Sequence, residues 1–168
     1  MSLNLTRIKL SYIEKHLYLS PATTMFSKAC EYGIRATIYV AVQSLEGKRA
    51  SLKSIAAEIE SPVAFTAKIL QDLVRKGLMH SVMGPTGGFE MDQQKLDSMK
   101  LSQIVDAIDG DSIYKGCGLG MKQCDESKPC PVHDKFAKVR ADLREMLEST
   151  NLLGLATELE TGSTFLKR

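Results

Sequence analysis

Residues 51–77 read SLKSIAAEIESPVAFTAKILQDLVRKG and contain two short apolar patterns on either side of a serine and a proline. The first half of this stretch predicts a short amphipathic helix, because apolar residues recur at spacings of three and four: Leu52, Ile55, Ala56 and Ile59. Ser61 and Pro62 then begin a second helix, since serine caps free amides and proline fits the first helical position. The apolar stripe of this second helix is formed by Phe65, Ile69, Leu70 and Leu73. Gly77 ends it, so the stretch predicts a helix-turn-helix.

A small β-hairpin is expected directly after these helices. Residues 78–82 and 89–91 are short extended runs on either side of the glycine-rich turn 84–88. A helix-turn-helix followed by such a wing is typical of the winged variant, whose second helix enters the DNA major groove. The alternative is that the two helices are only a packing unit that binds no DNA.

Further helices are expected over residues 27–45 with Ser27 as the cap, over residues 101–108, and over residues 134–151. The last of these carries Phe136, Val139, Leu143 and Met146 at spacings of three, four and three, which suits a partner helix. The sequence therefore predicts a mainly α protein with a small β-hairpin wing and a long C-terminal dimerisation helix. We divide it into an extension (1–24), a winged helix-turn-helix domain (25–110), a cysteine-rich cluster-binding loop (111–133), and a dimerisation helix with a C-terminal tail (134–168).

The composition is that of an ordinary soluble globular chain, with 168 residues of which 43% are hydrophobic and 25% charged. The formal charge of +2 is too small to indicate a polyanionic partner by itself, so DNA binding must depend on local arrangement. No membrane span or export signal is evident, which predicts a cytoplasmic protein. Met25 opens a much stronger element than the residues before it, so we expect residues 1–24 to be flexible or non-native.

Candidate DNA contacts come from the second helix of the motif, the wing and nearby cations. Thr66 and the alanines could touch thymine methyls, and Lys68 could reach a guanine edge or a phosphate. Cations outside the helix would position the protein on the phosphate backbone without reading sequence. The predicted set is Lys28, Lys53, Ala64, Phe65, Thr66, Ala67, Lys68, Arg75, Gly84, Thr86 and Gly87.

Three cysteines and a histidine lie close together in a segment that has no helical periodicity: Cys117, Cys124, Cys130 and His133. Thiolates are soft ligands for iron-sulfur clusters and zinc, and an imidazole can complete four-coordination. The wide cysteine spacing favours a 2Fe-2S cluster. The alternatives are 4Fe-4S, zinc, or a cofactor-free regulator whose thiols are inert or redox-active. A thiol enzyme with His133 as base lacks any accompanying substrate or oxyanion motif, so we expect no enzymatic activity. Cys30 lies in an apolar helical pattern and is expected in the core.

Several short motifs together resemble the Rrf2 family of winged-helix regulators. They are Met25-Phe-Ser-Lys28, Tyr32-Gly-Ile-Arg-Ala36, Ser51-Leu52 with Ile55-Ala56, Leu73 with Arg75-Lys-Gly-Leu78, and the wing Ser81-Val-Met-Gly-Pro-Thr-Gly-Gly-Phe89. The resemblance covers Met25 to about Thr150. It implies a homodimer that binds double-stranded DNA at a palindromic operator. We expect a repressor that senses iron-sulfur status, nitric oxide or redox state.

The resemblance also bears on the ligands and the wing. Cys130 and His133 match the variant in which a histidine joins three cysteines around 2Fe-2S. Other members take the fourth ligand from the first helix of the other subunit, where Glu31 is the nearest acidic residue here, and we prefer His133. Met83 stands where a cation often enters the DNA minor groove in this family, so that contact is not carried over to this chain.

Overall fold

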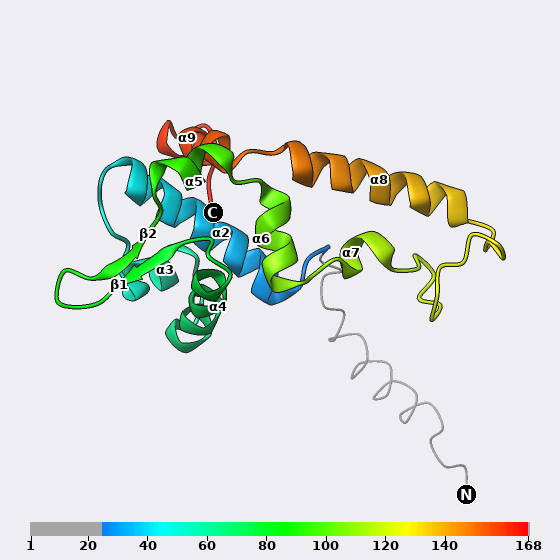
Figure 1. Cartoon of the computed structure of the whole chain (residues 1–168), viewed down its shortest axis with the longest axis horizontal. Coiled ribbons are helices and arrows are strands. Elements are labelled where there is room, and N and C mark those ends of the chain that lie inside the picture. The colour runs from blue at the N-terminus through cyan, green and yellow to red at the C-terminus, as the bar shows by residue number, and fades with distance from the viewer. Residues whose placement is uncertain (1–24, 168) are drawn as a thin grey trace, which may run out of the picture.

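The structure is a computed structural model that describes residues 25–167 (Figure 1). The extension predicted for residues 1–24 lies outside the described residues. The described part is mainly helical with one two-stranded antiparallel sheet, which confirms the predicted fold class. In chain order the elements are α2 Lys28–Leu45, α3 Leu52–Glu58, α4 Val63–Arg75, β1 His80–Val82, β2 Gly88–Glu90, α5 Gln93–Ser98, α6 Leu101–Ile108, α7 Ser112–Lys115, α8 His133–Ser149 and α9 Leu152–Glu160.

Helix α2 is the centre of the core, and its ends follow the predicted local signals. The Ser27 hydroxyl accepts the backbone N–H of Cys30, and Gly47 takes a positive φ of 69° just after the helix. Helices α4, α6 and α9 pack against α2. Cys30 is fully buried, as expected, and burial raises the pKa of its thiol to about 12.

The helix-turn-helix is formed by α3 and α4, which pack against each other. Ser51 caps α3 by accepting the backbone N–H of Ser54. The prediction that Ser61 caps α4 is wrong, because Pro62 occupies the cap position and Val63 is the first helical residue. The Ser61 hydroxyl is instead buried without a hydrogen-bond partner within residues 25–167.

Strands β1 and β2 form the wing, with Ser81 paired to Phe89. The base of the wing is fixed to the body because Ala50 and Phe89 exchange backbone hydrogen bonds of 3.0 and 2.8 Å. The turn is tight, since a Cβ on Gly87 would lie 2.3 Å from the carbonyl oxygen of Val82. Only glycine fits at this position without moving the backbone.

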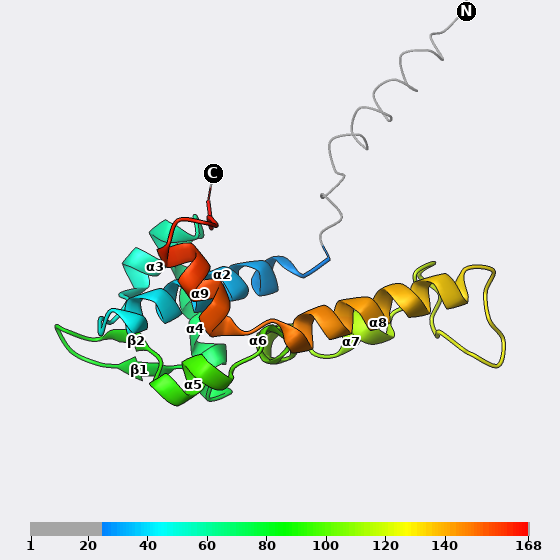
Figure 2. The same cartoon turned by 90° about the horizontal axis from the view of Figure 1, so that it is seen from above.

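Helix α8 projects away from the body and carries the cysteine loop at its outer end, opposite the wing (Figures 1 and 2). Its inner end is held by Leu147, which is fully buried in a cluster with Cys30 and Val105. Directly after α8, the N–H of Leu152 donates to the carbonyl of Met99 (2.9 Å), and the carbonyl of Thr150 accepts from Leu101 N–H (3.0 Å). We call this pairing of residues 99–101 with 150–152 the backbone bridge.

The segment after the backbone bridge folds back onto the body as α9 (Figure 2). The sequence pattern predicts only a tail here, so helix α9 was missed. Leu152 and Ala156 of α9 are fully buried in the main core, where α9 contacts α2 and α5. The core of the winged-helix body therefore includes residues from both ends of the described chain.

No helix within residues 25–167 combines the length and the apolar character needed to cross a membrane.

Replacing Leu152 by Ala should lower the free energy of unfolding by about 2–5 kcal/mol, because truncating a fully buried leucine leaves a cavity. Urea unfolding at fixed protein concentration measures this decrease. Leu119→Ala is the matched control, since Leu119 is 56% exposed in the cysteine loop and its truncation should have little effect. Equal stability of the two variants would show that α9 does not contribute to the core.

Candidate DNA-binding surface and cysteine loop

One face of α4 is open to solvent and lies beside the wing. Its exposed residues recur at spacings of four, three and four: Ala64, Lys68, Gln71 and Arg75. A groove of about 530 Å³ separates this face from the wing, and its lining includes Ala67, Lys68, Gln71, Ser81 and Phe89. The helix and the wing therefore form one continuous surface on which a duplex could lie.

Thr66 is not part of this surface, and its prediction as a DNA contact is wrong. The side chain is fully buried, and its hydroxyl donates to the carbonyl of Pro62 at 3.1 Å. Thr66 precedes the buried Ile69 and Leu70 by three and four residues, so helical geometry places it on the inner face. Burial costs little here, because the hydroxyl bonds back to its own helix and needs no water.

The structure leaves most of the other predicted DNA contacts accessible. Exposed are Lys28, Lys53, Ala64, Phe65, Lys68, Arg75, Gly84 and Thr86, while Ala67 and Gly87 are half-buried. Lys28 pairs with Glu31 at 2.7 Å, and this bond raises the pKa of Lys28. Arg75 pairs with Asp72, and the ring of Phe65 meets that of Tyr32 edge-on at 5.9 Å. Their contacts with DNA remain predictions.

Gln71 is a candidate contact that sequence reasoning missed. It is exposed, lies one turn after Lys68 and lines the same groove. A glutamine can make a bidentate contact with adenine. The signal was available in the sequence, because residue 71 follows the predicted Lys68 by three positions and must share its face.

The cysteine loop runs from α7 to the start of α8, and it brings one predicted pair of ligands into contact. Cys124 Sγ lies 3.4 Å from Nδ1 of His133, whose ring is buried in the first turn of α8. The backbone N–H groups of Leu119 and Met121 hold the pKa of Cys117 below its usual value, and the Cys130 side chain adds to this effect. None of the four cysteines forms a disulfide in the described part of the chain.

The donor atoms of these residues suit a soft metal or an iron-sulfur cluster, but the side chains do not converge on one point. Within residues 25–167, no three His, Cys, Asp or Glu side chains converge closely enough to hold a metal ion together. What the predicted ligands do form is the contact between Cys124 Sγ and His133 Nδ1. Three thiols and an imidazole in one loop are donors that suit iron-sulfur clusters and zinc.

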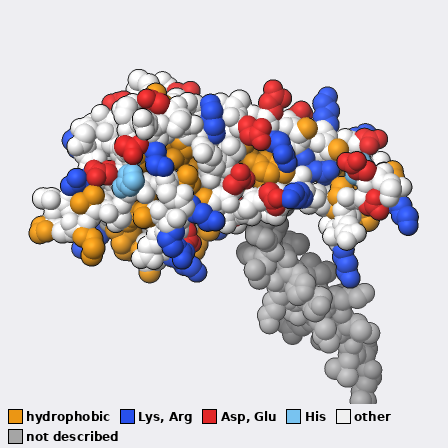
Figure 3. All heavy atoms as spheres, viewed as in Figure 1, with side chains coloured by type: hydrophobic (Ala, Val, Ile, Leu, Met, Phe, Trp, Pro, Cys, Tyr) orange, Lys and Arg blue, Asp and Glu red, His pale blue; other side chains and the backbone are white. Residues whose placement is uncertain are grey.

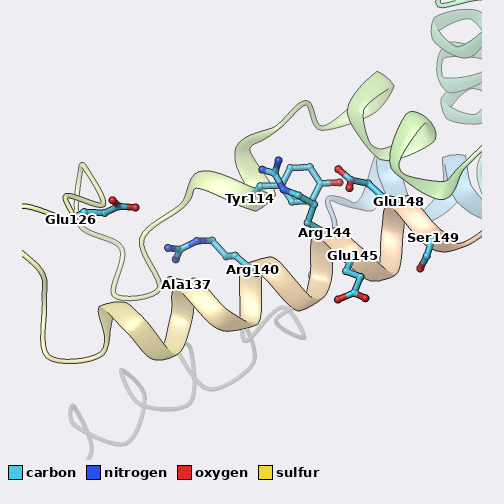
Figure 4. A pocket seen from close by; sticks show the side chains of 9 residues that line it. Tyr114, Glu126, Ala137, Arg140, Arg144, Glu145, Glu148 and Ser149 are labelled. Carbon is cyan, nitrogen blue, oxygen red and sulfur yellow. The ribbon is translucent and has the colours of Figure 1, made fainter.

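Helix α8 holds the loop through Arg140. The guanidinium donates to Cys124 Sγ at 3.6 Å and to the carbonyl of Gly116 at 3.2 Å. Arg140 also lines a groove of about 630 Å³ between α7 and α8, in which Arg144 lies against the ring of Tyr114 (Figure 4). Gly118 rests on the Phe136 ring so closely that a Cβ would lie 2.4 Å from it. The loop is thus attached to α8 at several points.

Comparison with known proteins identifies the family of this chain. The model of the Rrf2 family, described as an iron-dependent transcriptional regulator, matches residues 26–158. The chain belongs to the Rrf2 family of transcriptional regulators. This membership confirms the resemblance drawn from the sequence motifs.

Relatives of this Rrf2 regulator support the same conclusion. An HTH-type transcriptional regulator of Aquifex aeolicus is 26% identical over 133 residues, which are 78% of this chain and 90% of that protein. CymR of B. subtilis, the global cysteine regulator, has 23% identity and a TM-score of 0.64 over 79% of this chain and 95% of its own. IscR of T. potens has 21% identity and a TM-score of 0.63 over 82% of this chain and 90% of its own. These two structures show a shared fold, and the regulator relatives confirm that the chain is not an enzyme.

Replacing Arg140 by Gln should free the cysteine loop, because the guanidinium no longer joins α8 to Cys124 and Gly116. Endoproteinase Lys-C should then cleave the metal-free Rrf2 regulator faster after Lys122 and Lys128, which are exposed in the loop. We expect a severalfold faster cleavage, followed by mass spectrometry. The control Asp142→Asn changes an exposed residue of the same helix and should leave the rate unchanged. Equal rates in both variants would contradict this role for Arg140.

Proposed function

We propose that this Rrf2 regulator is a cytoplasmic homodimer that represses transcription from palindromic operators. In this proposal it senses iron-sulfur status, nitric oxide or redox state through an iron-sulfur cluster, most simply 2Fe-2S, held by the cysteine loop. The observation that carries the sensing role is the 3.4 Å approach of Cys124 to His133 in a loop with two further cysteines. That loop lies at the outer end of α8, and the DNA-binding surface lies at the other end of the molecule.

The ligands that we propose are Cys117, Cys124, Cys130 and His133. His133 is preferred over Glu31 of a second subunit for two reasons. It already contacts Cys124, whereas Glu31 is bound to Lys28 in an ion pair of 2.7 Å. A bound cluster would supply a centre whose charge or integrity changes with oxidants, nitric oxide or iron supply. Zinc bound by the same donors is the alternative, which would make the loop a structural staple.

The exposed face of α8 supports a homodimer. Phe136, Val139 and Met146 are 37%, 55% and 43% exposed although they are large and apolar. Together with the half-buried Leu143 they follow the spacing of a helix-helix seam. Packing this seam against a second copy would bury it and set the distance between the two recognition helices. That distance must be about 34 Å for the helices to occupy half-sites one DNA turn apart.

The attachment of the loop to α8 supports a coupling between the two functions. Arg140 and Phe136 contact the loop, and Phe136 also belongs to the seam. A rearrangement of the loop would therefore change the packing of α8 in the dimer and with it the separation of the recognition helices. Coupling free energies of this kind are typically about 1–3 kcal/mol.

The cofactor is tested by purifying the protein without oxygen and measuring its visible spectrum, iron and acid-labile sulfide. We expect a coloured protein, with colour and iron absent from Cys124→Ala and reduced in His133→Ala. Cys30→Ala is the matched control, because Cys30 is buried in the core and should not be a ligand. Glu31→Gln should retain the colour if His133 is the fourth ligand.

A colourless protein that contains stoichiometric zinc would contradict the cluster and favour the structural staple. Loss of iron in Glu31→Gln with full retention in His133→Ala would instead overturn the ligand assignment.

The DNA surface is tested with a duplex that the wild-type protein selects from a randomised library, compared with random duplex. Lys68→Ala combined with Gln71→Ala should weaken binding to the selected duplex by about 1–3 kcal/mol for each base that the variant no longer reads, with a smaller effect on random duplex. Lys53→Ala is the comparison variant, because removing a cation that binds a phosphate should weaken both duplexes alike. Equal weakening of both duplexes by the Lys68 and Gln71 variant would contradict base readout by α4.

A further inference from the structure

The wing of this protein carries no lysine or arginine. Between Gly77 and Met91 the charged or titratable side chains are only His80 and Glu90. His80 lies 3.2 Å from Asp92, and Glu90 is held by Arg49 at 2.8 Å, so both face partners at the base of the hairpin. The tip of the wing is therefore electrically neutral. It cannot attract phosphates in the way that a cationic wing would.

The tip is also apolar and fully accessible. Met83 is 95% exposed, the highest value among the large apolar side chains that the structure describes. It is followed by Gly84, which has a positive φ of 109°, and by the exposed Pro85. Hydrophobic side chains mark this end of the molecule in Figure 3, where the wing extends beyond the body. At this exposure the Met83 side chain contributes almost nothing to packing within residues 25–167.

The tip lies next to the candidate DNA-binding face of α4, which points to DNA as its partner. The wing is fixed to the body by the hydrogen bonds between Ala50 and Phe89, and its strand β1 lines the same groove as α4. With α4 in the major groove, a hairpin beside it meets the neighbouring stretch of the duplex. Apolar side chains such as methionine and proline can enter the minor groove and insert at base steps.

We propose that Met83 is a specificity-determining residue that enters the DNA minor groove as an uncharged wedge. This inference rests on the proposed DNA-binding surface and adds a second reading element to it. An apolar wedge gains affinity by burying the thioether, not by neutralising phosphates. It is favoured where the duplex opens easily, at TA and CA/TG steps, and gains nothing from the strongly negative narrow groove of an A-tract.

The test measures binding of the full chain to a duplex selected by the wild-type protein from a randomised library, over a series of salt concentrations. Met83→Ala should weaken binding about tenfold without changing the slope of log K against log salt, because no charge is removed. Met83→Leu should retain most of the affinity. Met83→Arg should steepen the slope by about 0.9 and, in a new selection, shift the preferred sequence under the wing toward A-tracts.

Phe165→Ala is the matched control, because Phe165 is a 77% exposed apolar residue near the C-terminal end and should not affect binding. If Met83→Ala binds like wild type while the Lys68 and Gln71 variant binds weakly, the wedge is refuted and the DNA surface stands. If Met83→Ala changes the self-association measured by ultracentrifugation and not DNA affinity, the tip contacts a second copy, and the inference is overturned. If wild type selects no duplex, the proposed DNA surface itself fails.

Discussion

The backbone bridge between residues 99–101 and 150–152 determines how the two ends of this molecule are connected. Its two hydrogen bonds, of 2.9 and 3.0 Å, join the start of α6 to the turn between α8 and α9. Asn151 strengthens the junction by donating from its side chain to the carbonyl of Asp97 at 2.9 Å. Because the chain is fixed there, α9 can return to the core while α8 projects outward. The direction of α8 is thus set by the same residues that complete the winged-helix body.

This arrangement places the cysteine loop far from the candidate DNA-binding surface, and α8 connects the two. The cysteine loop is attached to the outer part of α8 by Arg140 and Phe136, whereas the inner part is held by Leu147 in the core. Because α8 is fixed at its inner end and attached to the loop at its outer end, a local change in the loop can change the angle between α8 and the body. Such a change matters for DNA binding only if two copies of the winged helix must fit one duplex.

Short-range chemistry is the part of this structure that the sequence predicts best. The cap Ser27 and the stop signal Gly77 act within one helical turn, so the sequence locates them. Thr66 was predicted as a contact to thymine methyls, although its spacing from the buried stripe places it inside. Helix α9 was missed although Leu152, Leu155 and Leu159 recur at helical spacing after the cap Asn151. What the sequence does not show is that α9 packs against α2 and α5. The pairing of Cys124 with His133 depends on a loop conformation that spacing does not define.

We propose that the state of the cysteine loop controls the affinity of the winged helices for DNA. The most direct measurement compares one anaerobic preparation before and after a chelator removes its metal, using the same selected duplex at the same salt concentration. We expect Kd to change by about 5- to 150-fold between the two states, while circular dichroism stays the same. An unchanged Kd, with the metal gone and the fold intact, would contradict it.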